Sequence, residues 1–261
     1  MVRRFVKDMK RYIPYVLYAS KSDLKSEVAN SHLNWLWWIL DPLCFMLVYI
    51  FVALVVFRKS EPYFPVYVFM GLTLWYFFSR NIRASVTMVN SNKSIIKKIY
   101  VPKHVLILEN MLVNFFKMLV SFGLLVVLMI IYKVPLSLHI LHVIPILIVL
   151  CTVTFGLCTI LLHFGVFVQD IANLVTVLLR LMMYLSGIFY SIRDRVPEPY
   201  NMYLLRGNPA AFCIDAIRTA LLNQQSPDYL YLSIWFLAGL LLCAAGLKLI
   251  YKYENSYAKV I

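Results

Sequence analysis

The sequence predicts an all-α integral membrane protein with six transmembrane helices. Two observations support this fold class. First, 62% of the 261 residues are hydrophobic and only 14% are charged, whereas soluble domains carry about 25% charged residues. Second, the apolar residues gather in runs that can cross the ~30 Å hydrocarbon core of a bilayer, which takes about 20 residues per helix. These runs are too long for barrel strands and do not alternate between apolar and polar residues. They must therefore be helical, because a helix satisfies all of its backbone hydrogen bonds within the segment in lipid.

The first expected element is a basic amphipathic helix within residues 1–34. Its apolar residues recur at helical spacing, opposite its basic residues. The apolar set is Phe5, Val6, Met9, Ile13, Val16 and Leu17, and the basic set is Arg3, Arg4, Lys7, Lys10 and Arg11. Such a helix lies in the membrane interface rather than across the bilayer. The alternative is a solvated tail that only adds positive charge beside the first span.

Six apolar segments then have the length of a span. They are 35–57, 66–89, 108–132, 139–168, 171–190 and 229–251. We interpret 1–261 as a single membrane domain, with the spans within 35–251 and a tail at 252–261.

Basic residues orient these spans. If the N-terminus is cytoplasmic, the segments on that side hold 16 of the 25 Lys and Arg residues, and the outer segments hold seven. Arg80 and Arg83 are counted here with the cytoplasmic connector. Because positive charge accumulates in cytoplasmic loops, both termini are expected in the cytoplasm. The net charge of +13 therefore needs no nucleic-acid partner.

The connector between the fifth and sixth spans is unusually long, "SIRDRVPEPYNMYLLRGNPAAFCIDAIRTALLNQQSPD". Its apolar pieces "NMYLL" and "AAFCIDAIRTALL" are too short to span, so they predict short re-entrant or surface helices on the outer side. Asn208-Pro209 is typical of a helix start, because proline is favoured in the first turn.

No catalytic motif is present in the sequence. A phosphate-cradling G-x-x-x-x-G-K-[ST] loop is missing, so this chain is not expected to hydrolyse ATP by itself. His139 and His142 are three residues apart, but no carboxylate is close in sequence and no H-E-x-x-H pattern occurs, so no metal site is expected. We therefore expect neither an enzyme nor a cofactor bound by this chain.

Asp41, Lys117 and Arg180 are charged residues inside the predicted spans that call for an explanation. A charge in hydrocarbon costs ~2.5–3.5 kcal/mol on insertion scales, so each should face a partner or a water-filled path. Lys117 is expected to snorkel toward the cytoplasmic interface. Arg180 is nearer the middle of its span and is a candidate for a pathway or interface residue.

Aromatic residues make up 15% of the chain, and the run Trp75–Phe78 lies well inside a span. Aromatic faces stack on the C–H faces of sugars, and phenol and indole edges form hydrogen bonds, so this composition suits a glycan path. Ordinary core packing explains the same residues equally well.

Four stretches resemble a known family over nearly the whole chain. They are "SHLNWLWWILDPLCFMLVYIFV", "FMGLTLWYFFSRNIRASVTMVNSNKSIIKKIYVPKH", "LSGIFYSIRDRVPE" followed by "NPAAFCIDAIRTAL", and "GLKLIYKYENSYAKVI". They are similar to the membrane subunits of type-2 ABC exporters that move bacterial cell-surface polysaccharides such as O-antigens, capsules and teichoic acids. The second stretch is the most specific match, and Asn34 in the first stands where the family commonly has glycine.

The resemblance implies that the connector after the second span is a coupling helix that docks on a separate ATPase subunit. Isoleucines can anchor such a helix in a groove while lysines meet an acidic rim. The expected coupling residues are Lys93, Ile95, Ile96, Lys97, Lys98, Ile99 and Tyr100. Pro102 is expected to end this helix. The alternative is a solvated loop that only carries positive-inside charge.

The resemblance also implies a translocation path at a dimer seam and a gate on the outer side. The expected path residues are Tyr49, Phe69, Trp75, Tyr76, Phe77, Arg180, Tyr184 and Tyr190, and the expected gate residues are Asn208, Pro209, Phe212 and Arg218.

These expectations together describe the permease half of an ATP-driven exporter in the bacterial plasma (inner) membrane. It would act as a homodimer with two ATPase copies, which hold ATP and Mg²⁺, and would move a polysaccharide linked to a polyprenyl diphosphate. Drug or lipid efflux in the same fold is the alternative, and its path should be apolar and laterally open. A membrane-embedded glycosyl or acyl transferase is a third hypothesis, but the acidic or histidine cluster that it requires is not found.

Overall fold

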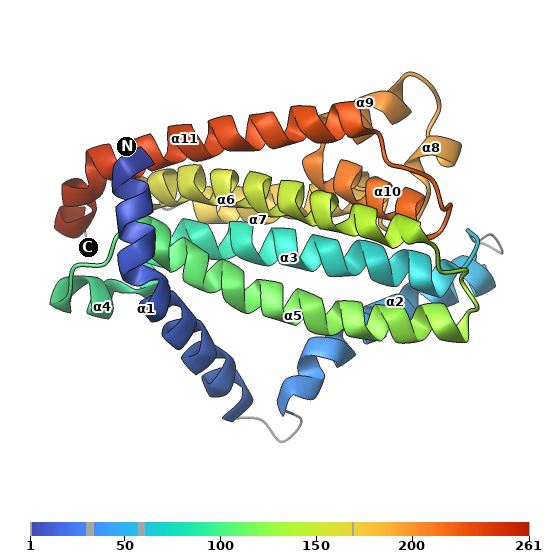
Figure 1. Cartoon of the computed structure of the whole chain (residues 1–261), viewed down its shortest axis with the longest axis horizontal. Coiled ribbons are helices and arrows are strands. Elements are labelled where there is room, and N and C mark those ends of the chain that lie inside the picture. The colour runs from blue at the N-terminus through green and yellow to red at the C-terminus, as the bar shows by residue number, and fades with distance from the viewer. Residues whose placement is uncertain (1, 30–33, 57–60, 169, 261) are drawn as a thin grey trace.

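The structure is a computed structural model that describes residues 2–29, 34–56, 61–168 and 170–260, and within these ranges every regular element is helical (Figure 1). The prediction of an all-α protein is confirmed. The α-helices are α1 (Val2–Ala29), α2 (Trp37–Phe51), α3 (Phe64–Ser91), α4 (Lys93–Lys98), α5 (Lys103–Ile131), α6 (Val143–Phe167), α7 (Ile171–Leu185), α8 (Ile192–Arg195), α9 (Tyr200–Gly207), α10 (Pro209–Leu221) and α11 (Tyr229–Val260). A 3₁₀ turn, η1 (Asn34–Leu36), precedes α2, a π-helical turn, η2 (Val52–Val56), continues it, and a 3₁₀ turn, η3 (Leu138–His142), precedes α6.

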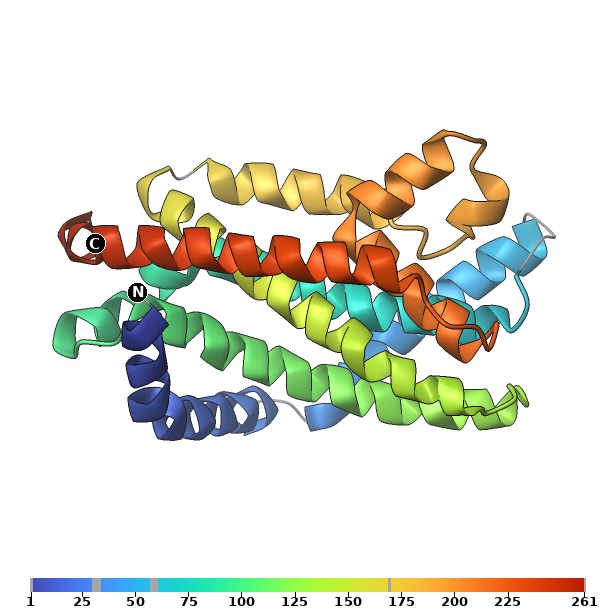
Figure 2. The same ribbon diagram turned by 45° about the horizontal axis from the view of Figure 1, so that its top comes forward.

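Helix α3 occupies the centre of the bundle. It contacts α2, α5, α6, α7 and α10, and most of its side chains are buried. Helices α5 and α6 extend beside it, and α11 packs along α6 (Figures 1 and 2). Because α3 is enclosed by other helices, its surface can carry aromatic and polar side chains that a lipid-facing helix could not.

Four helical segments in the described ranges are long and apolar enough to cross a membrane. They are Trp37–Val55, Lys103–Ile131, Leu138–Phe167 and Tyr229–Tyr257. Helix α3 does not belong to this group. Helix α7 is apolar but has only 15 residues, which corresponds to about 22 Å. Four of the six predicted spans therefore meet the criterion of length and composition.

Helix α7 ends five residues before the end of the predicted fifth span. Ser186 follows its last residue, and Gly187 has a positive φ of 63°. Glycine adopts this conformation without a Cβ penalty, so the chain turns here instead of continuing the helix.

Helix α1 crosses the basic end of the bundle and bends along its length, as expected for a helix that contains Pro14 (Figure 2). It packs against α5, where Ser20 Oγ donates a hydrogen bond of 3.1 Å to the carbonyl oxygen of Glu109. The predicted apolar face is divided. Val16 is buried against the bundle, whereas Ile13 and Leu17 are exposed.

Glycines allow α6 and α11 to pack closely. A Cβ atom on Gly156 would lie 2.9 Å from the backbone nitrogen of Cys243, and one on Gly239 would lie 3.1 Å from that of Val153. Small residues at such crossings let helix backbones approach each other in membranes.

We expect Gly156→Leu to separate α6 from α11 and to destabilise the protein by about 1–3 kcal/mol, the usual cost of overpacking. Gly123→Leu is the matched control, because a Cβ atom there meets nothing within 4 Å. The measurement is thermal melting of the detergent-solubilised protein, followed by size-exclusion chromatography. Equal melting temperatures for the two variants would contradict the close packing.

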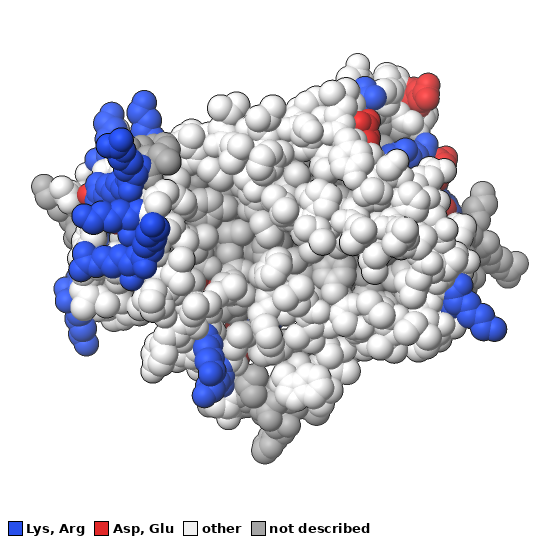
Figure 3. All heavy atoms as spheres, in the orientation of Figure 1, with Lys and Arg blue, Asp and Glu red and all other residues white. Residues whose placement is uncertain are grey.

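Charged side chains are distributed unevenly between the two ends of the bundle. Lys and Arg gather at the end where α1, α4 and the last part of α11 lie, while the opposite end carries both signs of charge (Figure 3). This distribution matches the positive-inside pattern that the sequence predicts.

Candidate coupling surface and translocation face

Helix α4 is an exposed helix at the basic end of the bundle (Figure 1). None of its residues is buried. Ile95 is 36% exposed, whereas Ile96 packs partly against the core. Lys97 and Lys98 are exposed. The two lysines and Ile95 are therefore accessible to a docking partner. Ile96 instead holds the helix partly against its own chain.

The residues after α4 differ from the prediction. The helix ends at Lys98 and Ile99 is extended, so the helix does not continue to Pro102. Pro102 instead occupies the N-cap position of α5. The segment between them exposes Ile99 and Tyr100, which are 52% and 60% exposed.

A polar cluster, the Arg4–Tyr100–Glu254 latch, joins α1, the segment after α4 and α11. Arg4 Nη2 donates hydrogen bonds to both carboxylate oxygens of Glu254 at 2.8 Å and to Tyr100 Oη at 3.1 Å. Tyr100 Oη also donates to Glu254 Oε2 at 3.1 Å. The hydrogen bond to Glu254 is the main cause of the raised pKa of Arg4, and burial raises the pKa of Tyr100.

A second contact joins α1 and α11. Tyr251 Oη donates a hydrogen bond of 3.0 Å to Asp8 Oδ2. The first and last helices are therefore connected at two positions, and Tyr100 also connects them to the end of α4. On the sequence alone, these residues were treated separately.

A face of the bundle has α3 as its floor and α2 and α7 as its sides. Two cavities lie along it. The first, the arginine cavity, has a volume of about 280 Å³ and is lined by Asp41, Phe45, Trp75, Tyr76, Ser79, Arg80, Arg83, Leu179, Arg180 and Met183. The second, the aromatic cavity, has a volume of about 320 Å³ and is lined by Tyr49, Val52, Ala53, Phe64, Phe189, Tyr190 and Arg195.

Most of the expected path residues reach this face. Trp75, Tyr76 and Arg180 line the arginine cavity, and Tyr49 and Tyr190 line the aromatic cavity. Tyr184 lies on α7 and is 60% exposed. Its carbonyl oxygen accepts a hydrogen bond of 2.9 Å from Tyr190 Oη.

Two expected path residues lie elsewhere. Phe69 is fully buried in the core of this chain. Phe77 is also buried, and its ring meets that of Phe115 edge-on at a centroid distance of 6.2 Å. Both pack between helices, because α3 is surrounded and only one side of it borders the arginine and aromatic cavities.

Arg80 and Arg83 lie within α3, which continues to Ser91. The predicted span 66–89 already included both residues, although their charges were counted with the cytoplasmic connector. Arg80 Nη2 forms an ion pair of 2.9 Å with Asp41 Oδ2, and its guanidinium lies 4.9 Å from the centre of the Tyr76 ring. The intramembrane Asp41 therefore has its partner on the next helix.

Lys117 has partners on α1 and α2, and its snorkelling toward the cytoplasmic interface stays a prediction. Its Nζ lies 2.7 Å from Glu27 Oε1 and 5.6 Å from the centre of the Trp38 ring. The positive charge is compensated by an ion pair with α1 and a cation–π contact with α2.

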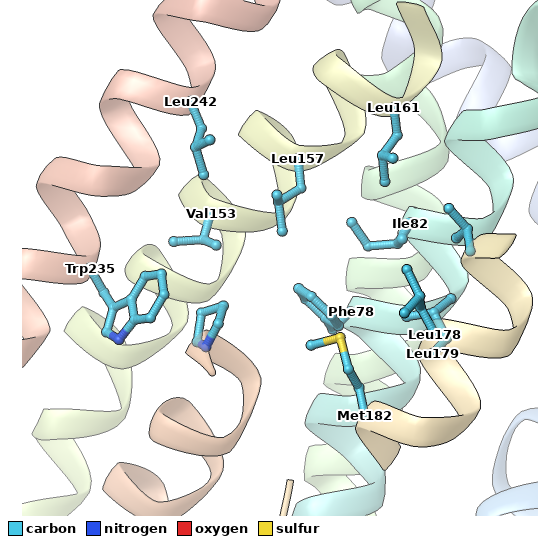
Figure 4. Close-up of a pocket in the computed structure, with 12 residues that line it drawn as sticks. Phe78, Ile82, Val153, Leu157, Leu161, Leu178, Leu179, Met182, Trp235 and Leu242 are labelled. Carbon is cyan, nitrogen blue, oxygen red and sulfur yellow. The ribbon is translucent and has the colours of Figure 1, made fainter. Parts of the chain in front are cut away.

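A third cavity lies on the other side of α7. Its volume is about 350 Å³, and apolar side chains of α3, α6, α7 and α11, together with Pro209, surround it (Figure 4). Figure 4 shows Phe78 and Met182 toward one side and Trp235 toward the other. Trp235 Nε1 is buried and has no hydrogen-bond partner in the described part of the chain.

The expected gate residues are packed inside the structure. Asn208 caps α10 by accepting hydrogen bonds from the backbone nitrogens of Ala210 and Ala211, at 3.0 and 3.3 Å, which confirms the predicted helix start. Pro209 borders the apolar cavity, and Phe212 is buried. The gate itself stays a prediction.

Arg218 is only 6% exposed and joins three segments of the chain. Its guanidinium donates hydrogen bonds to the carbonyl oxygens of Tyr67, Gly187 and Ile188, the shortest being 2.7 Å to Gly187. Arg218 lies on α10 and links this helix to α3 and to the turn after α7. We call it a structural staple for this reason. A Cβ atom on Gly71 would lie 2.7 Å from Arg218 Nη2, so this glycine leaves room for the guanidinium.

Within the described ranges, no group of three or more His, Cys, Asp or Glu side chains could hold a metal ion. The candidate site consists of the exposed polar connector at α4 and the cavities between helices.

Helices long and apolar enough to cross a bilayer, with cavities between them, are compatible with a membrane transport component. Residues 16–222 match the model of the ABC-2 type transporter family, and the chain belongs to this family. It is similar to the O-antigen export system permease protein RfbA of Klebsiella pneumoniae, with 28% identity over 93% of both chains. A protein of the same name from Myxococcus xanthus is 25% identical over 86% of both chains.

Proposed function

We propose that this chain is the permease subunit of an ATP-driven exporter that moves a lipid-linked polysaccharide across the bacterial plasma membrane. The observation that carries the proposal is the similarity, over nearly the whole chain, to permeases named for O-antigen export. The aromatic and arginine-lined cavities support it, because aromatic faces suit sugars and guanidinium groups suit phosphates.

In this proposal α3 and α7 complete a six-helix membrane domain, with α3 shielded by its neighbours. The basic end of the bundle faces the cytoplasm, in accord with the positive-inside rule, and both termini lie on that side. The exposed side of α1, which includes Ile13 and Leu17, rests in the membrane interface.

Helix α4 docks on a separate ATPase subunit, which binds ATP and Mg²⁺. Two permease chains and two ATPase chains form the transporter. Closure of the ATPase pair on ATP displaces α4, and the Arg4–Tyr100–Glu254 latch carries this displacement to α1 and α11. The glycan then moves along the face between α2 and α7, and α9 and α10 gate the outer end.

Drug or lipid efflux is the second candidate function. The specific observation in its favour is the apolar cavity behind α7, because a hydrocarbon substrate needs a lining without charges.

The deciding experiment is deletion of the gene in its source bacterium, under conditions that keep the cells viable, followed by feeding of labelled sugar. We expect loss of label from the surface polysaccharide and accumulation of lipid-linked polysaccharide on the cytoplasmic side. Re-expression of the wild-type gene should restore the surface label. Unchanged surface polysaccharide after deletion would contradict the proposal and favour drug or lipid efflux.

A further inference from the structure

The arginine cavity contains more positive than negative charge. Three guanidinium groups line it, from Arg80, Arg83 and Arg180, together with a single carboxylate, Asp41. In the described part of the chain, Arg80 pairs with Asp41, and neither Arg83 nor Arg180 has an ion-pair partner. The cavity therefore has a surplus of two positive charges.

These arginines lie well inside their helices. Arg80 is about 16 Å along α3 from its end at Ser91, and Arg180 is about 14 Å from the start of α7 at Ile171. Charged side chains at membrane depth are costly unless a partner or water compensates them. Asp41 and Lys117 each have a protein partner, whereas Arg83 and Arg180 are exposed side chains without an ion-pair partner in the described part of the chain.

The surroundings of the arginines are suited to a phosphate group attached to a hydrocarbon. Guanidinium groups bind phosphate oxygens through paired, charge-assisted hydrogen bonds. Leu179 and Met183 of α7 and Phe45 of α2 border the same cavity. An amphiphilic ligand could place its anion on the arginines and its chain against these residues, and a volume of about 280 Å³ accommodates a diphosphate group.

Resting on the proposed function, we infer that the arginine cavity binds the diphosphate that joins the lipid anchor to the glycan. A diphosphate esterified at both ends carries two negative charges, which equal the surplus positive charge of the cavity. A phospholipid with a single phosphodiester, such as phosphatidylglycerol, carries one. Charge matching therefore favours the diphosphate-linked anchor over ordinary anionic lipid.

The test is direct binding to the permease–ATPase complex in phosphatidylcholine nanodiscs. The probe is a radiolabelled short-chain polyprenyl diphosphate that carries one sugar. We expect Arg83→Gln and Arg180→Gln each to weaken binding about tenfold, because each removes a charge-assisted hydrogen bond. Arg180→Lys should retain most of the affinity, since it keeps the charge. Arg206→Gln is the matched control, because Arg206 lies on α9 and contacts Tyr231 outside this cavity.

Competition identifies the recognised group. Unlabelled inorganic diphosphate should displace the probe at lower concentration than inorganic phosphate. Displacement by phosphatidylglycerol as effective as that by unlabelled probe would overturn the inference and assign the cavity to membrane lipid. Probe binding that is equal in wild type, Arg83→Gln and Arg180→Gln, in complexes that elute as intact assemblies, would also overturn it.

Failure of this inference is distinguishable from failure of the proposed function. If gene deletion removes surface polysaccharide while the arginine variants bind the probe normally, the export function stands and the diphosphate site lies elsewhere. If deletion leaves surface polysaccharide unchanged, the export function fails independently of the binding result.

Discussion

Replacing Lys97 and Lys98 together by glutamate is expected to reduce surface polysaccharide at least about tenfold, while the protein still inserts in the membrane. Both side chains are exposed on α4, where no residue is buried, so the change leaves the core intact. Like charges that face each other across an interface cost several kcal/mol, so an acidic rim on the ATPase would reject the reversed helix. The measurements are labelled surface glycan in cells and co-purification of the ATPase with the permease.

Lys97→Arg with Lys98→Arg is the control for this double variant, because it keeps the charge at both positions. We expect it to export normally. A glutamate variant that inserts, co-purifies with the ATPase and exports at the wild-type rate would remove the docking role of α4 and leave the solvated-loop alternative.

Replacing Arg218 by methionine is expected to destabilise the protein by about 3–5 kcal/mol. Methionine fills similar space but leaves the carbonyl oxygens of Tyr67, Gly187 and Ile188 without their donor in a buried position. Unpaired buried polar groups carry the full cost of desolvation. The melting temperature of the detergent-solubilised protein should therefore fall well below that of the wild type.

Arg206→Met is the comparison for the Arg218 variant, since Arg206 is exposed on α9. Its melting temperature should stay within about 2 °C of the wild type, as expected for a surface change below 0.5 kcal/mol. Equal melting of the Arg218 and Arg206 variants would show that the buried guanidinium is not a structural staple, and would return Arg218 to the group of gate candidates.

The sequence was sufficient for the fold class and for features that depend on neighbouring residues. Apolar run length predicted long helices, and Asn208-Pro209 predicted the start of α10, because both signals are local. The exposed position of α4 followed from its polar composition between two apolar runs.

Features that depend on distant partners could not be read from the sequence. Lys117 and Glu27 are 90 residues apart, and Arg4 and Glu254 are 250 apart. Periodicity assigns a residue to a helix face but does not say which helix covers that face. For this reason Phe77 could not be separated from Tyr76 in the aromatic run, although packing buries one and brings the other to the arginine cavity.

The latch has a mechanical consequence for the whole chain. A single carboxylate, that of Glu254, holds both a guanidinium from the first helix and a phenol from the segment behind α4. If a docked ATPase displaces α4, the shared carboxylate links that displacement to α1 and α11 together. In the proposed transporter, the nucleotide cycle would then move the first and last helices of the chain at the same time.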